Sequence, residues 1–119
     1  MTDEVDAARI RDFTGLMAEI IARKRVSAAS VARVSDVGNA RGALLLSGSQ
    51  IPTRDEVLKI AVAISMAPRE ADAVLVAAGH PPLDRADPRD TLIASRLERG
   101  RSLVLTSAEL VEAGEEGLL

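Results

Sequence analysis

The sequence predicts an all-α protein, and three observations lead to that prediction. Apolar residues recur every three or four positions along most of the chain, which is the period of a helix with one buried face. No segment alternates apolar and polar residues as a half-buried strand would. Glycine, proline and helix-capping residues interrupt the pattern at intervals of about one short helix. Apolar residues make up 47% of the chain, and Phe13 is the only aromatic, so the expected core is aliphatic.

The first predicted helix spans residues 5–25. Ile10, Phe13, Met17 and Ile20 fall at helical spacing and form its apolar face. Three consecutive cations at 23–25 lie in its last turn, where positive charge interacts favourably with the helix dipole. We therefore expect one long amphipathic helix at the start of the chain.

The segment 26–52 predicts two short helices joined by a tight turn. Ser27 is the expected N-cap of the second helix, and residues 36–39 have the composition of a turn. The third helix is expected at 39–46, with Gly48 as its stop. This is the layout of a helix-turn-helix over 27–47, a motif that places its second helix in the major groove of DNA.

A fourth and a fifth helix are expected after residue 52. Thr53 and Glu56 have the spacing of a capping box, in which each side chain satisfies a free backbone N–H at the helix start. Pro68 occupies the first position of the fifth helix, where its missing N–H costs nothing, and Gly79 ends that helix. The buried stripe of the fourth helix is predicted to be Val57, Leu58, Ala61 and Ile64.

A sixth and a seventh helix complete the chain. Asp87-Pro88 starts the sixth helix, which ends near Gly100. The seventh starts at Ser102 or at Thr106, since residues 106–109 could form a second capping box, and it ends at Gly114. These two helices form a C-terminal pair over 84–119.

An internal repeat relates the last four helices at an offset of 35 residues. Any two amphipathic helix pairs share part of such a pattern, but the matched aspartate starts and Ala-Gly ends favour a true repeat. Residues 55–83 and 90–118 are therefore predicted to be two helix pairs of similar construction. The aligned residues are Asp55 with Asp90, Val57-Leu58 with Leu92-Ile93, Val62 with Leu97, Leu75-Val76 with Leu110-Val111, Ala78-Gly79 with Ala113-Gly114, and Leu83 with Leu118.

The chain lacks the residue groups that catalysis and metal binding require. It has no cysteine, which excludes disulfides and thiolate metal ligands. His80 is the only histidine, without an evident ligand or triad partner, and no glycine-rich phosphate loop occurs. We predict a protein that is not an enzyme and has no metal or cofactor. The acidic N-terminus lacks a signal-peptide pattern, and no window approaches the roughly 18 apolar residues of a membrane span, so a cytoplasmic location without a membrane partner is expected.

Charge is distributed unevenly along the chain. Residues 9–60 carry a net charge of +4, against −3 for residues 1–8 and −4 for residues 61–119. A basic segment beside an acidic one is typical of a weak polyanion-binding face next to a partner-binding face. Chance scatter of solvated charges would produce the same numbers.

From Phe13 to Ala78 the chain resembles the phage-repressor-like (XRE-type) helix-turn-helix domains, because apolar and turn residues fall at that family's spacing without a gap. The resemblance extends to a small bacterial subgroup with an extra C-terminal helix pair. It implies a helix-turn-helix domain of about five helices over 1–83, followed by 84–119 as a dimerisation or partner-binding extension. The residues that carry it are Val26-Ser27, Val31-Ala32, Val37, Leu45, Gly48, Pro52, the run Thr53-Arg54-Asp55-Glu56-Val57-Leu58, Ala61, and Glu70 to Gly79; for the subgroup they are also Pro82-Leu83, residues 88–90, Gly100 and Ser102.

The chain departs from the family's pattern at four positions. Ala28 stands where the family often has a glutamine that braces a phosphate or a base. Gly42 replaces the branched aliphatic residue that usually anchors the third helix, and glycine in a helix interior costs about 0.5–1 kcal/mol relative to alanine. Leu44 and Leu46 stand at positions where polar residues are common. These departures motivate a second hypothesis, a protein-binding adaptor, beside DNA binding.

The leading hypothesis is a small DNA-binding regulator of transcription that inserts the helix 39–46 into the major groove of double-stranded DNA as a homodimer. Asn39 would then pair with adenine and Arg41 with guanine, while small apolar side chains touch thymine methyls. For each residue alone a simpler interpretation stays open, with Asn39 as a helix cap and Arg41 as a solvated surface group. The predicted DNA-binding positions are Ser27, Ala28, Asn39, Ala40, Arg41, Leu44, Ser49 and Arg54.

The alternative hypothesis is a protein-binding adaptor that keeps the fold and has lost DNA reading. Leu44, Leu45 and Leu46 cannot all point inward, because successive residues on a helix lie about 100° apart. At least one should be exposed, or covered by the C-terminal helix pair. An exposed apolar patch there would mark a partner site on the third helix, with the C-terminal helices as a second candidate.

Overall fold

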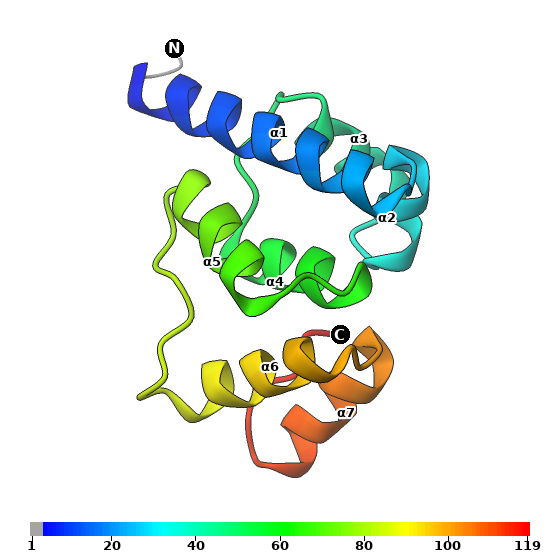
Figure 1. The fold of residues 1–119 in the computed structure, drawn as a ribbon, viewed down its shortest axis with the longest axis vertical. Helices are drawn as coiled ribbons and strands as arrows, with labels where there is room; N and C mark the ends of the chain where they lie inside the picture. Colours follow the sequence, from blue (N-terminus) through cyan, green and yellow to red (C-terminus); the bar gives the residue numbers. More distant parts are fainter. Residues whose placement is uncertain (1–3) are drawn as a thin grey trace.

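The computed structural model describes residues 4–119. Within that range the regular secondary structure consists of α-helices joined by turns and loops, without a β-strand, as predicted (Figure 1). The helix boundaries lie within a residue or two of the expected ones, and the third helix matches its predicted range at both ends. The helices are α1 (Glu4–Lys24), α2 (Ala28–Val34), α3 (Asn39–Leu46), α4 (Arg54–Ala63), α5 (Pro68–Ala77), α6 (Pro88–Arg99) and α7 (Leu103–Glu112).

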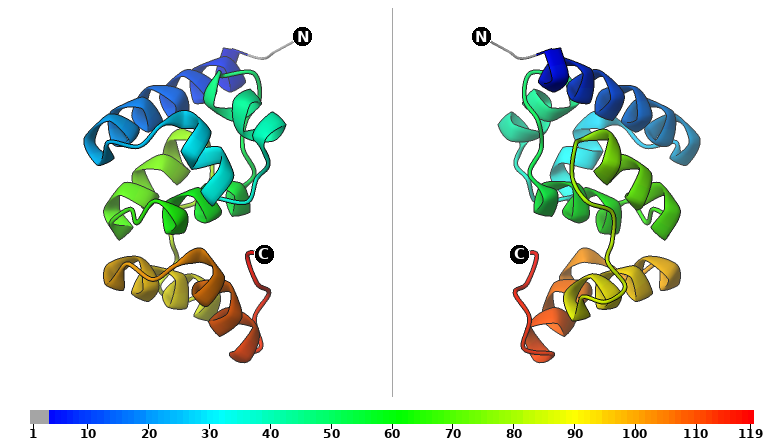
Figure 2. Two further views of the ribbon diagram at one scale, coloured as in Figure 1. Left: turned by 90° about the vertical axis from the view of Figure 1, so that its right-hand side faces the viewer. Right: turned by 90° about the vertical axis from the view of Figure 1, so that its left-hand side faces the viewer.

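The helices are arranged in three tiers. The first tier holds α1, α2 and α3, the middle tier holds α4 and α5, and the last holds α6 and α7 (Figures 1 and 2). One apolar core runs through all three tiers, from Phe13 on α1 to Leu110 on α7. Among residues 4–119, no helix is both long and apolar enough to cross a bilayer.

Local capping signals determine where most helices begin. The Ser27 hydroxyl accepts a hydrogen bond from the Ser30 N–H (3.1 Å) and caps α2. The capping box of α4 is confirmed, since Thr53 Oγ1 accepts from the Glu56 N–H (3.1 Å) and Glu56 Oε1 accepts from the Thr53 N–H (2.8 Å). Pro68 is the first residue of α5, as expected.

Of the two starts expected for the seventh helix, Ser102 is confirmed, and the alternative capping box at 106–109 does not form. Ser102 is the N-cap of α7, and its hydroxyl accepts from the Leu105 N–H (3.2 Å). Thr106 and Ser107 are buried within the helix. The Ser107 hydroxyl instead accepts from the backbone N–H groups of Leu118 (3.0 Å) and Leu119 (2.9 Å), and so fastens the C-terminal end to α7.

The helices α2 and α3 cross at two small residues. A Cβ atom added to Gly42 would lie 2.3 Å from the Ala32 Cβ and 3.1 Å from the Ala32 Cα. This contact explains the missing aliphatic anchor on the third helix: at position 42 the Ala32 methyl group, with the Ala32 Cα behind it, occupies the space that a side chain would need. Glycine at position 42 therefore sets how closely α2 and α3 approach.

The internal repeat is confirmed, and it extends to the hydrogen bonds. Helices α5 and α7 begin and end at positions separated by the same 35 residues. The Leu83 N–H donates to Asp72 Oδ1 (2.8 Å), and 35 residues later the Leu118 N–H donates to Ser107 Oγ (3.0 Å). The α5–α6 connection and the C-terminal end are therefore fastened in the same way.

Two crossed ion pairs join the repeats. The Arg54 guanidinium donates to both carboxylate oxygens of Asp90 (3.0 and 2.7 Å), and the Arg89 guanidinium donates to both oxygens of Asp55 (2.9 and 3.1 Å). Arg89 lies 35 residues after Arg54, and Asp90 lies 35 after Asp55, so each repeat supplies the same two residues. The remaining hydrogen bonds of the two arginines also match at this offset, since they go to the carbonyls of residues 81 and 82 from Arg54 and to those of residues 116 and 117 from Arg89.

This reciprocity means that the two helix pairs are related by an approximate two-fold axis, as in an isologous dimer. The packing follows the same rule: α4 lies against α7, α5 lies against α6, and α4 meets α6 at the centre. Burial raises the pKa of Asp90, but hydrogen bonds from Arg54 and from the Asp84 N–H, with the charges of Arg54 and Arg89, lower it overall. Asp90 is therefore an ionised group inside the pseudo-symmetric interface.

Candidate functional site

The three consecutive leucines of α3 divide between the core and the surface. Leu45 is fully buried, Leu46 is half-buried, and Leu44 is 39% exposed. The expectation that at least one of them would be exposed is thus confirmed. The C-terminal helix pair packs beneath α4, and it leaves Leu44 uncovered.

Most of the predicted DNA-binding positions surround the exposed side of α2 and α3. Ser27 and Ala28 lie exposed at the start of α2, Ala40 and Leu44 are exposed on α3, and Ser49 is exposed just after α3. The hydroxyls of this group make hydrogen bonds to neighbouring residues. Ser27 caps α2, and Ser49 Oγ lies 3.0 Å from Ser47 Oγ. Asn39 is the first residue of α3, and its side chain lies outside the described part of the structure.

Arg41 is directed away from this exposed side. Its guanidinium donates to Glu56 through Nε (2.7 Å to Oε2) and Nη2 (2.8 Å to Oε1), and it also donates to Gln50 Oε1. Hydrogen bonds from Arg41, and then from Thr53, outweigh burial and hold the pKa of Glu56 below its usual value. The same contact raises the pKa of Arg41. The arginine thus connects α3 to the capping box of α4.

Arg54 is bound in the interface with the C-terminal helices. Both of its terminal nitrogens donate to Asp90, whose side chain is 3% exposed, and Nε and Nη2 also donate to the carbonyls of Pro81 (3.3 Å) and Pro82 (3.1 Å). The hydrogen bond to Asp90 raises the pKa of Arg54. A phosphate contact from Arg54 would require these hydrogen bonds to break.

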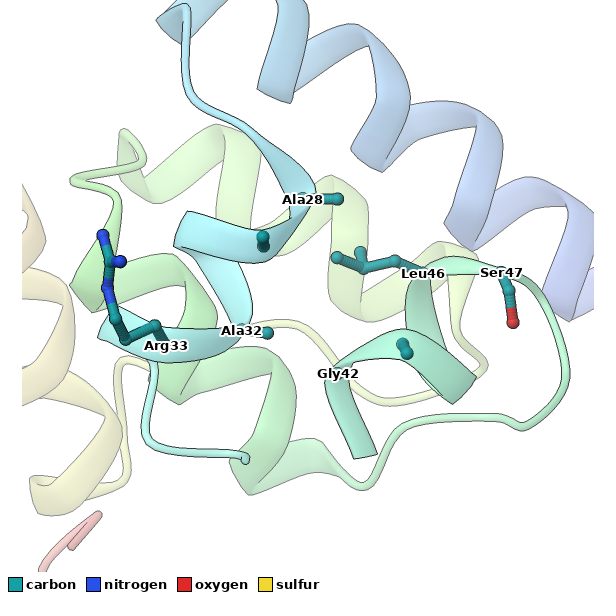
Figure 3. A pocket seen from close by; sticks show the side chains of 8 residues that line it. Ala28, Ala32, Arg33, Gly42, Leu46 and Ser47 are labelled. Atoms are coloured by element: carbon teal, nitrogen blue, oxygen red, sulfur yellow. The ribbon is translucent and has the colours of Figure 1, made fainter. Parts of the chain in front are cut away.

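A shallow hollow of about 540 Å³ lies between α2 and α3 (Figure 3). We call it the α2–α3 hollow. The Leu46 side chain extends from α3 toward Ala28, while Arg33 and Ser47 stand at its two ends (Figure 3). Arg33 is the only charged residue of the lining, which consists of Ala28, Ala29, Ala32, Arg33, Gly42, Ala43, Leu46 and Ser47.

Arg33 also borders a second hollow, of about 450 Å³, between the end of α2 and the start of α7. Exposed apolar side chains from three segments meet there, namely Val34, Val104 and Leu119. Sequence reasoning missed Ala29, Ala32 and Arg33 as parts of the site. The pairing of Ala32 with Gly42 was the available signal, because two small residues on neighbouring helices permit close approach.

The described residues 4–119 hold no group of three or more histidine and acidic side chains suited to a metal ion. His80 lies in the turn after α5, as predicted, and its Nε2 atom is 2.7 Å from the Pro52 carbonyl oxygen. This contact ties the turn to the segment that enters α4.

Comparisons of the chain with protein-family models, with curated proteins and with solved structures find no match. The similarity to phage-repressor-like domains therefore rests on the residues alone, and function is argued from the surface just described.

Proposed function

We propose that the protein is a helical interaction module that binds a partner protein on the α2–α3 hollow. One observation carries the proposal: the exposed side of α2 and α3 is apolar and small, while the nearby Arg41 and Arg54 are held by Glu56 and Asp90. A surface that reads DNA draws its affinity from free cations near phosphates. A surface of alanine, glycine and leucine favours apolar contact with protein instead.

The chemistry of the hollow indicates the kind of partner. Its walls are two helices, and an amphipathic helix that inserts apolar side chains between them is a recurrent mode of recognition. The alanine and glycine walls leave room for leucine- or valine-sized anchors. Arg33 is exposed at one end, where it favours an acidic residue on the flank of the partner helix. The proposed occupant is therefore an amphipathic helix with aliphatic anchors and an acidic flank.

The experiment is a binding screen of the full chain against synthetic amphipathic helices with leucine or valine anchors and either acidic or basic flanks. Acidic-flanked helices should bind, and Ala43→Arg, which places a long cation in the hollow, should weaken that binding at least about tenfold. Ala73→Arg is the matched control, since Ala73 is an exposed alanine on α5. Arg33→Glu should shift the preference toward basic flanks. Absence of binding, or equal binding by the Ala43→Arg variant, would refute the proposal.

The second candidate is a DNA-binding regulator of transcription that uses α3 in the major groove. The accessibility of α3 supports it, because Ala40 and Leu44 are exposed on a short helix at the surface. Fluorescence anisotropy on duplex DNA at low salt tests it, since phosphate contacts are strongest there. The Ala43→Arg variant separates the two candidates, because an added cation strengthens DNA binding and weakens the binding of an apolar helix.

A further inference from the structure

The second hollow, between the end of α2 and the start of α7, adjoins the α2–α3 hollow, because Arg33 lines both. Arg33 stands at one end of the α2–α3 hollow (Figure 3), and the left-hand view of Figure 2 shows the C-terminal end of the chain close to α2. We call the second hollow the α2–α7 hollow. Its lining consists of Arg33, Val34, Asp36, Ala63, Ser102, Leu103, Val104 and Leu119.

Three exposed aliphatic side chains meet in the α2–α7 hollow. Val34, Val104 and Leu119 are 45%, 66% and 54% exposed, and they come from three separate segments of the chain. The Ser107 hydroxyl holds the last of these segments in place, because it accepts hydrogen bonds from the N–H groups of Leu118 and Leu119. A cluster of exposed aliphatic side chains, unlike a single one, indicates an interaction site.

The internal repeat shows that this aliphatic cluster is specific to the second helix pair. The positions 35 residues before Val104 and Leu119 are Arg69 and Asp84, which are charged and exposed. The packing of a helix pair therefore does not require aliphatic side chains at these two positions. The copy that has them is the one whose α7 lies beside the end of α2. Contact with a partner that also touches α2 accounts for this difference between the copies.

Two exposed charges favour one placement of a partner along the two hollows. Arg33 lies where the hollows adjoin, and Asp36 lines the α2–α7 hollow. Neither side chain makes an ion pair within residues 4–119. A partner that crosses both hollows is therefore matched by an acidic residue between two apolar segments, with a basic residue beside the second segment.

We infer that the two hollows form one continuous groove, and that the groove binds an amphipathic helix with two aliphatic segments separated by an acidic residue. This inference rests on the proposed function, because the first segment occupies the α2–α3 hollow. Two adjoining hollows of this size, each roughly 8 Å across, accommodate about three turns of a helix, so the two sets of anchors are about seven residues apart. The C-terminal helix pair thus supplies part of the binding surface, through Val104 and Leu119.

The experiment is a binding titration of the full chain with two synthetic helices of equal length. Both helices carry leucines for the α2–α3 hollow and a glutamate at the centre. About seven residues after the first leucines, one helix carries further leucines and the other carries glutamines. The helix with two leucine segments should bind at least about tenfold more tightly, because its second segment contacts the α2–α7 hollow. Exchange of the central glutamate for lysine should weaken its binding.

A variant of α7 assigns this advantage to the α2–α7 hollow. Val104→Glu should abolish the advantage, because it places a charge among the aliphatic side chains of the hollow. Glutamate is compatible with the helix at this position, since Val104 lies in the first turn of α7. Val111→Glu is the matched control and should leave the advantage unchanged, because Val111 is 62% exposed on the same helix and lines neither hollow. Circular dichroism verifies that both variants are folded.

The outcomes separate this inference from the proposed function. If the chain bound neither helix, the proposed function would fail, and the inference would fail with it. Equal binding of the two helices would overturn the inference alone, since the α2–α3 hollow would still bind its segment. An advantage that survived in Val104→Glu, or that Val104→Glu and Val111→Glu reduced equally, would also overturn the inference alone.

Discussion

Replacement of Gly42 by alanine should destabilise the protein, although alanine is the better helix former. The added Cβ would lie 2.3 Å from the Ala32 Cβ, whereas carbon atoms in contact prefer about 3.5–4.0 Å. α2 and α3 would therefore have to separate by roughly 1 Å or more. Overpacking of this kind costs about 1–3 kcal/mol, and the gain in helix propensity offsets about 0.5–1 kcal/mol of it. We expect a net loss of about 1–2 kcal/mol of unfolding free energy.

Urea denaturation followed by circular dichroism measures this loss. Gly15→Ala is the matched control, because Gly15 lies on the exposed side of α1 and an added Cβ meets no atom within 4 Å. That variant should be stabilised by about 0.5–1 kcal/mol, from helix propensity alone.

The double variant Gly42→Ala with Ala32→Gly isolates the steric effect. Removing the opposing methyl group should make the pair less destabilised than the sum of the single variants, by about 1 kcal/mol. If Gly42→Ala stabilised the protein as much as Gly15→Ala does, the close approach of α2 and α3 would be refuted. Strict additivity of the double variant would refute the assignment of the clash to Ala32.

Four further predictions concern the polar contacts. Glu56→Ala removes both the capping box and the acceptor for Arg41, so it should lower the unfolding free energy by about 1–2 kcal/mol in the same denaturation assay. Asp90→Asn should cost about 2 kcal/mol, because it weakens the buried pair with Arg54. The pKa values of Asp90 and Glu56 are lowered in the folded chain. The stabilising effect of these two carboxylates is therefore complete above their unfolded-state pKa values, and it is lost as the pH falls through their folded-state pKa values. Thermal melts should show stability declining below about pH 4, and the decline should be less steep in the Asp90→Asn variant. Ser107→Ala leaves two C-terminal backbone amides without an acceptor and should speed their hydrogen exchange, whereas an unchanged rate would contradict the anchoring role.

The helix boundaries could be predicted because their causes are local. Ser27, Thr53 and Pro68 act within one turn of the helix that each begins, so the sequence window contains all the interacting groups. The capping box expected as an alternative at 106–109 does not form, and the reason is that only local sequence was used to predict it. A Thr-x-x-Glu spacing is compatible with a cap, but burial of Thr106 and Ser107 depends on how α7 packs, which a local window does not contain.

The crossed ion pairs could not be predicted from local spacing. Arg54 and Asp90 lie 36 residues apart, and Arg89 and Asp55 lie 34 apart. The 35-residue offset was visible in the apolar positions, but it does not state how the two copies face one another. A translation would give a contact in one direction only, whereas the reciprocal contacts Arg54–Asp90 and Arg89–Asp55 identify the approximate two-fold relation.

The fold shows that much of the positive charge of residues 9–60 is paired with carboxylates. That segment has nine cations, and five of them form ion pairs: Arg9 with Asp6, Arg23 and Lys24 with Glu70, Arg41 with Glu56, and Arg54 with Asp90. Three of the four carboxylates belong to segments outside 9–60, so the local excess of +4 is largely balanced by the acidic flanks.

A charge count along the sequence therefore overstates the field that a polyanion would meet at α3. Arg33 is the one cation that lines the α2–α3 hollow. A single cation in the hollow supports few phosphate contacts there, and phosphate contacts are what give DNA binding its affinity and its salt dependence. Since the surface beside Arg33 is apolar, the same cation is better suited to orient a partner helix by its acidic flank. The balance of charge within the fold, more than the identity of any residue on α3, is what favours protein over DNA as the ligand of this surface.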